Sequence, residues 1–272
     1  RGPVNPAGLG FYERLVDELL DNGITPWVTL YHWDLPQALE DAGGWPNRDT
    51  AYRFAEYSAI VHEHLGDRVK HWITLNEPFV SAFVGYAAGR HAPGLRDPRA
   101  ALQSVHHLLL GHGLALQELR KQNAENVGIT LNLYSVHAAS DSEVDREAAR
   151  RTDGLGNRFF LDPVLLGRYP DDVLLDTGMT EWFAERESDL EVIAAPVDFM
   201  GINYYSRHTA AGPEDGVFAD PDVPSASPGS ERVRHVDTGA PKTYMGWEIH
   251  PDGLVDVVQM VHDRAAELPI YI

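Results

Sequence analysis

A glutamate at the end of an apolar run is the most promising chemical group in the sequence. Residues 71–79, HWITLNEPF, have the pattern of a buried strand that ends in Asn76, Glu77 and Pro78. A carboxyl group at such a position can serve catalysis, or it can be a solvated or salt-bridged structural group. The preceding amide could hold a ligand hydroxyl beside the acid, and the proline would stiffen the turn that orients it. These neighbours favour Glu77 as a candidate general acid or base.

Polar and aromatic residues also follow the other apolar runs. The segments are Tyr31-His32-Trp33-Asp34, Asn132-Leu133-Tyr134 and Asn203-Tyr204-Tyr205. Amide, imidazole and carboxylate groups bind hydroxyls, and aromatic rings pack against the apolar face of a sugar, so the pattern favours a polyhydroxylated ligand. The alternative is structural: each histidine or tyrosine would then be a hydrogen-bonded core residue, and each tryptophan would serve packing alone.

The elements that would position these groups alternate between strands and helices. Apolar runs at 24–31, 69–76, 127–133 and 197–205 predict parallel strands covered on both faces, and a fifth run begins at 268–272. Apolar stripes at helical spacing predict helices within 9–20, 54–65, 105–119 and 254–265. This repetition predicts an α/β fold with right-handed crossovers.

Long segments rich in Gly and Pro follow three of the predicted strands, at 32–48, 77–99 and 206–253. In a β/α barrel the loops after the strands build the active site. An open doubly wound sheet has the same alternation, so the pattern alone leaves both architectures open. No internal repeat or linker divides the chain, and we expect one domain over residues 1–272.

The composition limits the classes of partner. The net charge of −19 disfavours nucleic acids and anionic membranes, and 43% hydrophobic residues suffice for a substantial core. The absence of Cys excludes disulfides and zinc–thiolate sites, and no apolar run reaches the roughly 18 residues of a membrane span. We expect no nucleic-acid or membrane partner and a location in a bacterial cytoplasm; the oligomeric state stays open.

Several motifs that could hold a metal or cofactor are incomplete. HEH at 62–64 and HHLLLGH at 106–112 lack the i, i+4 spacing of a helical zinc site. GLG at 154–156 lacks the third glycine of a dinucleotide fingerprint and follows no predicted strand. No G-x-S-x-G or phosphate-binding loop is present. We therefore expect neither a metal nor a cofactor.

Motifs along the whole chain resemble the β-glucosidases of glycoside hydrolase family one. They are, in order, TLYHWDLPQALEDAGGW (29–45), WITLNEPF (72–79), GRHAPG (89–94), HHLLLGHG (106–113), GITLNL (128–133), RFFLDPVLLGRYP (158–170), DFMGINYYSR (198–207), MGWEIHPDGL (245–254) and LPIYI (268–272). The resemblance implies a (β/α)8 TIM barrel, here incomplete. It also implies a retaining β-glycosidase that hydrolyses terminal β-D-glucosyl residues of oligosaccharides or of aryl and alkyl glucosides. Such an activity belongs to carbohydrate metabolism and cellulose degradation.

The resemblance also assigns roles to residues at matching positions. Glu77 would be the general acid/base, and Asn76 would bind the 2-hydroxyl of the sugar. The other substrate-binding positions would be His32 and Trp33 in the sugar subsite, Asn203 near the catalytic acids, Tyr205 on the nucleophile, and Trp247 on the aglycone side. Phe79 replaces a tryptophan that is common in the family, so the aglycone preference is in doubt there.

The second carboxylate of the implied mechanism does not occur in the chain. In the family it lies in a Thr-Glu-Asn-Gly motif that follows a stretch like LPIYI, and this sequence ends at Ile272. The resemblance implies barrel strands three to six and the start of seven, with truncation at both ends. Such a piece would have unpaired sheet edges and an exposed apolar face, and we expect it to be inactive alone.

Other interpretations of the same chain stay open. It could be a non-catalytic barrel fragment or a sugar-binding remnant. It could also derive from a 6-phospho-β-glucosidase, although the net charge of −19 argues mildly against an anionic sugar.

Overall fold

Five strands run parallel in one sheet, and their order in the sheet follows their order in the sequence. The computed structural model describes residues 3–214 and 225–272. The parallel strands are β1 (Trp27–Tyr31), β2 (His71–Asn76), β3 (Asn126–Ala138), β4 (Phe199–Ala211) and β6 (Ile270–Tyr271). A two-residue strand, β5 (Arg234–His235), pairs antiparallel with the end of β4. Each of the five predicted runs overlaps one parallel strand. Their order never reverses, which is the arrangement of a barrel and not of a doubly wound sheet.

Aromatic residues at the start of the strands show that the sheet curves strongly. The ring of Trp27 on β1 stacks on His71 at 4.1 Å and contacts Tyr271 on β6 at 4.6 Å between centroids. These two strands lie at opposite ends of the parallel set, so their side chains meet across the concave face. Phe199 is buried in this cluster, whereas Trp27 and Tyr271 are 37% and 48% exposed. The apolar face is therefore partly covered by its own aromatic residues.

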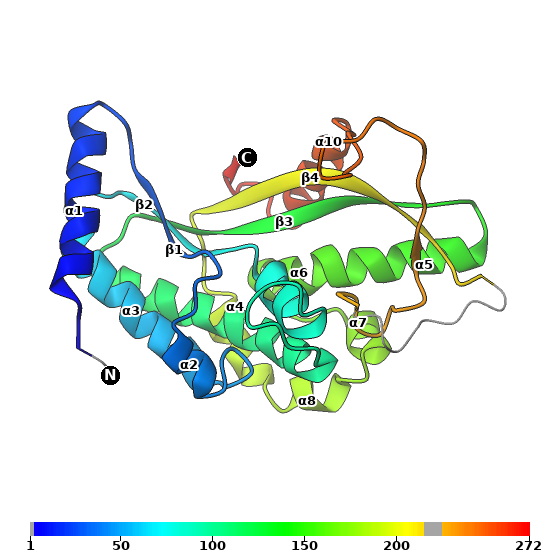
Figure 1. Ribbon diagram of the computed structural model, residues 1–272, viewed down its shortest axis with the longest axis horizontal. Coiled ribbons are helices and arrows are strands. Elements are labelled where there is room, and N and C mark those ends of the chain that lie inside the picture. The colour runs from blue at the N-terminus through cyan, green and yellow to red at the C-terminus, as the bar shows by residue number, and fades with distance from the viewer. Residues whose placement is uncertain (1–2, 215–224) are drawn as a thin grey trace.

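Four helices overlap the predicted amphipathic stripes. They are α1 (Pro6–Asp21), α3 (Asp49–Leu65), α4 (Pro98–Lys121) and α10 (Gly253–His262). The side chains of Asn5 and Asp97 accept backbone N–H groups at the starts of α1 and α4, which satisfies donors that the helices cannot pair themselves. Figure 1 shows α3 and α4 side by side beneath the sheet and α10 beside β4.

The crossover from β3 to β4 consists of helical segments that the sequence pattern does not predict. They are α5 (Glu143–Asp153), η2 (Gly154–Arg158), α6 (Phe159–Leu166), α7 (Asp171–Asp176), α8 (Thr180–Ala184), η3 (Glu187–Asp189) and α9 (Leu190–Ile193). Only Ala148 is buried in α5, so this helix lacks an apolar stripe. The other segments are too short to show a helical period.

Two predicted loops contain helical structure. The segment 77–99 holds a buried π-helix, η1 (Val80–Ala87), and the segment 32–48 holds the short helix α2 (Gln37–Asp41). The sequence of η1, VSAFVGYA, is apolar on every side and therefore shows no amphipathic period. The π-helix starts three residues after Glu77, and such segments are frequent at functional sites.

Strands β3 and β4 are longer than predicted. Leu133 pairs with Tyr204 but Ser135 pairs with Arg207, so β4 contains one extra residue between these pairs. This irregularity is a β-bulge, and the two strands continue together beyond it to Ala138 and Ala211. The apolar runs that predict both strands end near this bulge, at 133 and 205, because polar residues follow there.

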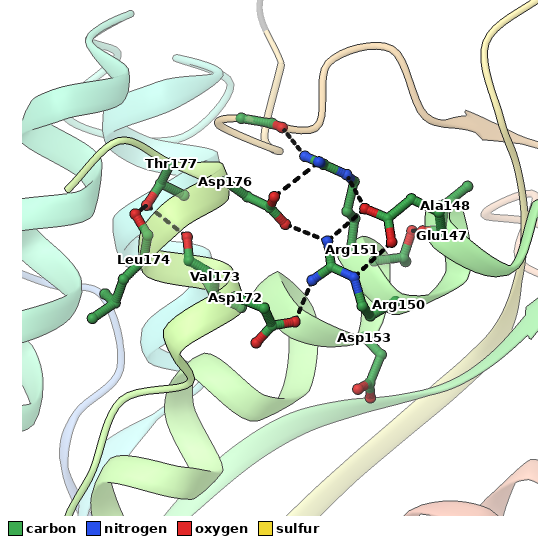
Figure 2. Close-up of polar contacts among 12 residues, drawn as sticks. Glu147, Ala148, Arg150, Arg151, Asp153, Asp172, Val173, Leu174, Asp176 and Thr177 are labelled. Atoms are coloured by element: carbon green, nitrogen blue, oxygen red, sulfur yellow. Dashed lines mark hydrogen bonds and ion pairs between the residues drawn. The ribbon is translucent and has the colours of Figure 1, made fainter. Parts of the chain in front are cut away.

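A network of ion pairs joins α5 and α7 (Figure 2). Arg150 pairs with Glu147 and Asp176 at 2.6 Å and also contacts Asp172. Arg158 makes a bidentate contact with Asp172, with both N–O distances 2.7 Å. These guanidinium groups hold the pKa of the Asp172 carboxyl below its ordinary value, and Arg150 lowers the pKa of Glu147 to about 2.

We expect this network to make the protein sensitive to acid. A carboxyl group with a lowered pKa in the folded state stabilises that state above its unfolded pKa, and this stabilisation is lost as the pH falls towards the folded value. The free energy of unfolding in urea should therefore fall between about pH 5 and pH 2. Asp172→Asn should cost about 1–3 kcal/mol at pH 7 and flatten that decrease.

The neighbouring Asp171→Asn is the matched control, because Asp171 makes no ion pair within the described residues. Equal unfolding free energies for the two variants at pH 7 would contradict a stabilising role of the network.

Within residues 3–214 and 225–272, no helix combines the length and the apolar character that a membrane span requires.

Candidate functional site

Glu77 directly follows β2 and is buried, with 3% of the residue exposed. Its φ of +46° is unusual for a residue with a side chain, and its backbone N–H donates to the carbonyl of Thr130 at 2.9 Å. Such strained backbone persists only where neighbours fix it, and it is frequent at active sites. The hydrogen bond to β3 and the following Pro78 supply that support here.

Two neutral donors contact one oxygen of the Glu77 carboxyl group. Asn203 Nδ2 and the Tyr205 hydroxyl each donate to Oε1 at 2.7 Å. Both residues lie on β4, and since alternate residues of a strand face the same side, positions 203 and 205 reach the same group. The second oxygen, Oε2, has no hydrogen bond within the described residues, which leaves it for a ligand or a proton.

Asn76 links the carboxyl group to the end of β1. Its Oδ1 accepts from Asn203 Nδ2 at 3.0 Å, and its Nδ2 lies 3.3 Å from His32 Nε2. Because the Asn76 amide nitrogen can only donate, His32 Nε2 is the acceptor and the ring proton sits on Nδ1. One N–H of Asn76 thus remains available to a ligand.

Trp33 fixes the backbone beside this amide. Its φ is +77°, and its indole N–H donates to the backbone carbonyl of Asn76 at 2.9 Å. The centroid of its ring lies 4.9 Å from that of His32 and 5.7 Å from that of His91. The predicted sugar-subsite residues His32 and Trp33 therefore contact the same short segment as Glu77.

Tyr205 and Trp247 form the more exposed side of the group. Their ring centroids are 5.2 Å apart, and the two residues are 45% and 41% exposed. Burial and the contact with Glu77 raise the pKa of the Tyr205 hydroxyl, so it stays a neutral donor. The resemblance places this hydroxyl on the nucleophile, whereas here it donates to Glu77.

Phe79 directly precedes η1 and packs inside an aromatic cluster. Its ring lies 5.1 Å from Phe83, 5.9 Å from Tyr134 and 6.1 Å from Phe160. One side of the ring is thus held by the core. Phe79 is partly buried, which is compatible with a contact to the aglycone. The aglycone role of Phe79 stays a prediction.

Asn132 and Tyr134 also belong to this face; they are among the polar and aromatic residues that follow the apolar runs, but the resemblance assigns neither of them a role in the site. Asn132 on β3 pairs in register with Asn203, and its Nδ2 donates to the Tyr134 hydroxyl at 2.7 Å. Burial raises the pKa of Tyr134 to about 12, so it too is a neutral hydrogen-bonding group. Their position at a strand end was visible in the sequence, and no spacing rule distinguished them from core residues.

The histidines of the rejected metal motifs have partners inside the protein. His106 contacts the Tyr169 hydroxyl and Asp189, each at 2.9 Å. His107 Nδ1 lies 3.0 Å from the Trp45 carbonyl, and His112 Nδ1 lies 2.6 Å from the Thr74 hydroxyl. Burial lowers the pKa values of His107 and His112 to about 4, so both are neutral structural groups near pH 7.

A separate cavity of about 190 Å³ lies between β1, α2 and α3. It is lined by residues such as Leu35, Trp45 and Tyr57 and includes none of the eight predicted site residues. Its apolar lining offers few groups for a polyhydroxylated ligand. The cluster around Glu77 is therefore the stronger candidate site.

The whole chain, residues 1–272, matches the model of glycosyl hydrolase family 1. The chain belongs to this family. It is 53% identical to thermostable β-glucosidase B of Thermobispora bispora over 93% of its length, and 42% identical to a 1,4-β-D-glucan glucohydrolase of Thermotoga neapolitana over all of it. The crystal structure of a psychrophilic β-glucosidase from Micrococcus antarcticus superposes with a TM-score of 0.91 at 51% identity, over 99% of this chain.

These relatives are longer than the present chain. It spans 50% of the Thermobispora protein, 61% of the Thermotoga protein and 60% of the Micrococcus structure. The likeness confirms the predicted barrel fold and shows that the 272 residues make up part of that barrel.

Proposed function

We propose that residues 1–272 carry the acid/base half of a retaining β-glycosidase that acts on terminal β-D-glucosyl residues. The observation that carries the proposal is the buried Glu77 carboxyl group, which is held by Asn203 and Tyr205 and leaves Oε2 free of hydrogen bonds within the described residues. In this role Glu77 protonates the leaving glycosidic oxygen and then activates the water that completes hydrolysis.

The surrounding residues support a sugar as the ligand. Asn76 keeps one N–H free beside the acid, and His32 Nδ1–H offers a second donor nearby. Trp33 and Trp247 supply aromatic faces at the two sides of the group. We propose that the amide binds the 2-hydroxyl, that His32 and Trp33 contact the sugar, and that Trp247 and Phe79 face the aglycone.

The relatives' names point to the same class of substrate. One is a 1,4-β-D-glucan glucohydrolase, and a Thermotoga maritima β-glucosidase that is 42% identical was solved with isofagomine lactam and with deoxynojirimycin. We propose glucosides of the kind released from cellulose as substrates. The cytoplasmic location and the lack of nucleic-acid partners stay predictions.

The proposed chemistry needs a second carboxylate. Retaining enzymes place the nucleophile about 5–5.5 Å from the acid. The hydrogen-bond partners of the Glu77 carboxyl group within the described residues are an amide and a phenol, and the 272-residue sequence contains no Thr-Glu-Asn-Gly segment. We therefore propose that the nucleophile belongs to the remaining part of the family's barrel, and that the 272-residue chain alone is inert.

The test is the release of nitrophenol from an aryl β-D-glucoside by the 272-residue chain, with Glu77→Gln measured beside it. We expect equal rates for the two proteins, because neither can form the glycosyl-enzyme. A rate clearly above that of the variant would show that another carboxylate of this chain acts as nucleophile. Circular dichroism of both proteins would confirm that the comparison is between folded chains.

A further inference from the structure

Three side chains that commonly bind metals meet on the side of β4 opposite to Glu77. They are His137 at the end of β3, His250 just before α10, and Asp256 in the first turns of α10. One ligand atom of each lies within 4.8 Å of those of the other two. The group is separate from the candidate active site, because Tyr204, which contacts it, faces away from Asn203 and Tyr205.

Hydrogen bonds fix the elements that carry these side chains. The Ser135 hydroxyl donates to Asp256 Oδ2 at 2.5 Å and lies 2.9 Å from His137 Nε2. The Tyr204 hydroxyl donates to the backbone carbonyl of His250 at 2.7 Å. The start of α10 thus rests directly on β3 and β4, and the three ligands need little chain movement to meet.

The spacing suits a tetrahedral ion. With metal–ligand bonds of about 2.0–2.2 Å, the ligand atoms of such a site lie roughly 3.3–3.6 Å apart. His137 Nε2 and Asp256 Oδ2 are already 3.5 Å apart. The His137 side chain is 47% exposed, so its ring can turn from Ser135 towards His250 without disturbing the core.

We propose that His137, His250 and Asp256 bind a divalent transition-metal ion such as Zn²⁺, with water in the fourth position. Two imidazoles and one carboxylate favour Zn²⁺, Ni²⁺ or Co²⁺ over Mg²⁺ and Ca²⁺, which prefer oxygen ligands. The ion joins the extension of β3 to the start of α10. It thereby also restrains the segment that carries Trp247, three residues before His250.

The sequence alone gives no sign of this site. Its ligands lie at positions 137, 250 and 256, so no short motif contains the set. The expectation of no metal rested on helical spacing at 62–64 and 106–112, and those histidines are distant in sequence from the present cluster.

Equilibrium dialysis of the 272-residue chain against Zn²⁺, in a large excess of Mg²⁺, tests the proposal. We expect a tight site that holds one Zn²⁺ per chain. His137→Ala and His250→Ala should each weaken it at least about 10-fold, because each removes a ligand. His262→Ala is the matched control, since His262 is an exposed histidine at the other end of α10.

A further variant distinguishes the loss of metal binding from the loss of folding. Asp256→Asn keeps a side chain of the same size that can still accept from Ser135, and it should also weaken the Zn²⁺ affinity at least about 10-fold. Unchanged affinity in the histidine variants would overturn the proposal, and the polar cluster would then be a hydrogen-bonded contact only. Displacement of Zn²⁺ by Mg²⁺, or equal loss in His262→Ala, would overturn it as well.

Discussion

Glu77→Gln is expected to lower kcat for an alkyl β-D-glucoside by about 10²–10⁴-fold in an enzyme that contains residues 1–272 and a complete barrel. A suitable enzyme is a chimera in which this chain replaces the matching segment of the Thermobispora bispora β-glucosidase, which is 53% identical to it. Glutamine can still accept from Asn203 and Tyr205 through its carbonyl oxygen, so the local contacts are kept. It cannot protonate the leaving oxygen, and an alkoxide is a poor leaving group without a proton.

A nitrophenyl glucoside distinguishes the loss of the general acid from a structural effect of the Glu77→Gln substitution. Nitrophenolate leaves without a proton, so the rate of glycosyl-enzyme formation from it should fall far less than that from the alkyl glucoside. Glu63→Gln on the exposed face of α3 is the matched control and should keep both rates. Equal losses with both substrates in Glu77→Gln would contradict the role as general acid.

Asn76→Ala is expected to lower kcat/KM for glucosides by about 10²–10³-fold in the same chimera. Hydrogen bonds to the 2-hydroxyl strengthen in the transition state and contribute several kcal/mol, and each 1.36 kcal/mol corresponds to a factor of ten in rate. Asn203 Nδ2 and His32 Nε2 orient the Asn76 amide, so that its remaining N–H is fixed beside the carboxyl group.

A 2-deoxyglucoside tests whether the amide acts through that hydroxyl. Asn76→Ala should change kcat/KM for this substrate only slightly, because a sugar without the 2-hydroxyl cannot form that hydrogen bond even in the parent chimera. The two changes together then form a double-mutant cycle with a large coupling energy. A loss of the same size for both substrates would mean that Asn76 only supports Glu77 and does not contact the 2-hydroxyl.

The convergence of Glu77, Asn203 and Tyr205 could be predicted because it follows from strand direction. Parallel strands end at the same edge, so polar residues at their carboxyl ends must lie close together. The strands and the helices α1, α3, α4 and α10 could be predicted for a similar reason, since each has an apolar pattern of sufficient length.

Other features depend on contacts that no local pattern encodes. The π-helix at Val80–Ala87 is buried at every residue except Val84, and α5 buries only Ala148, so neither has an amphipathic stripe. The left-handed backbone of Trp33 and Glu77 arises from support by Asn76 and Thr130, which tertiary packing brings into place. The hydrogen bond from the Tyr205 hydroxyl to Glu77 is a further example, because the resemblance places this hydroxyl on the nucleophile.

The most direct test of the central claim is the anomer formed when Glu77→Ala in the chimera hydrolyses a nitrophenyl glucoside in the presence of azide. In a retaining enzyme the sugar is bound to the nucleophile on its α face, and azide can attack the β face without help from a general base. The proposed acid/base role predicts that β-glucosyl azide forms and that azide increases the turnover rate of the variant. Formation of α-glucosyl azide would contradict it, because azide would then have taken the place of Glu77 as the nucleophile.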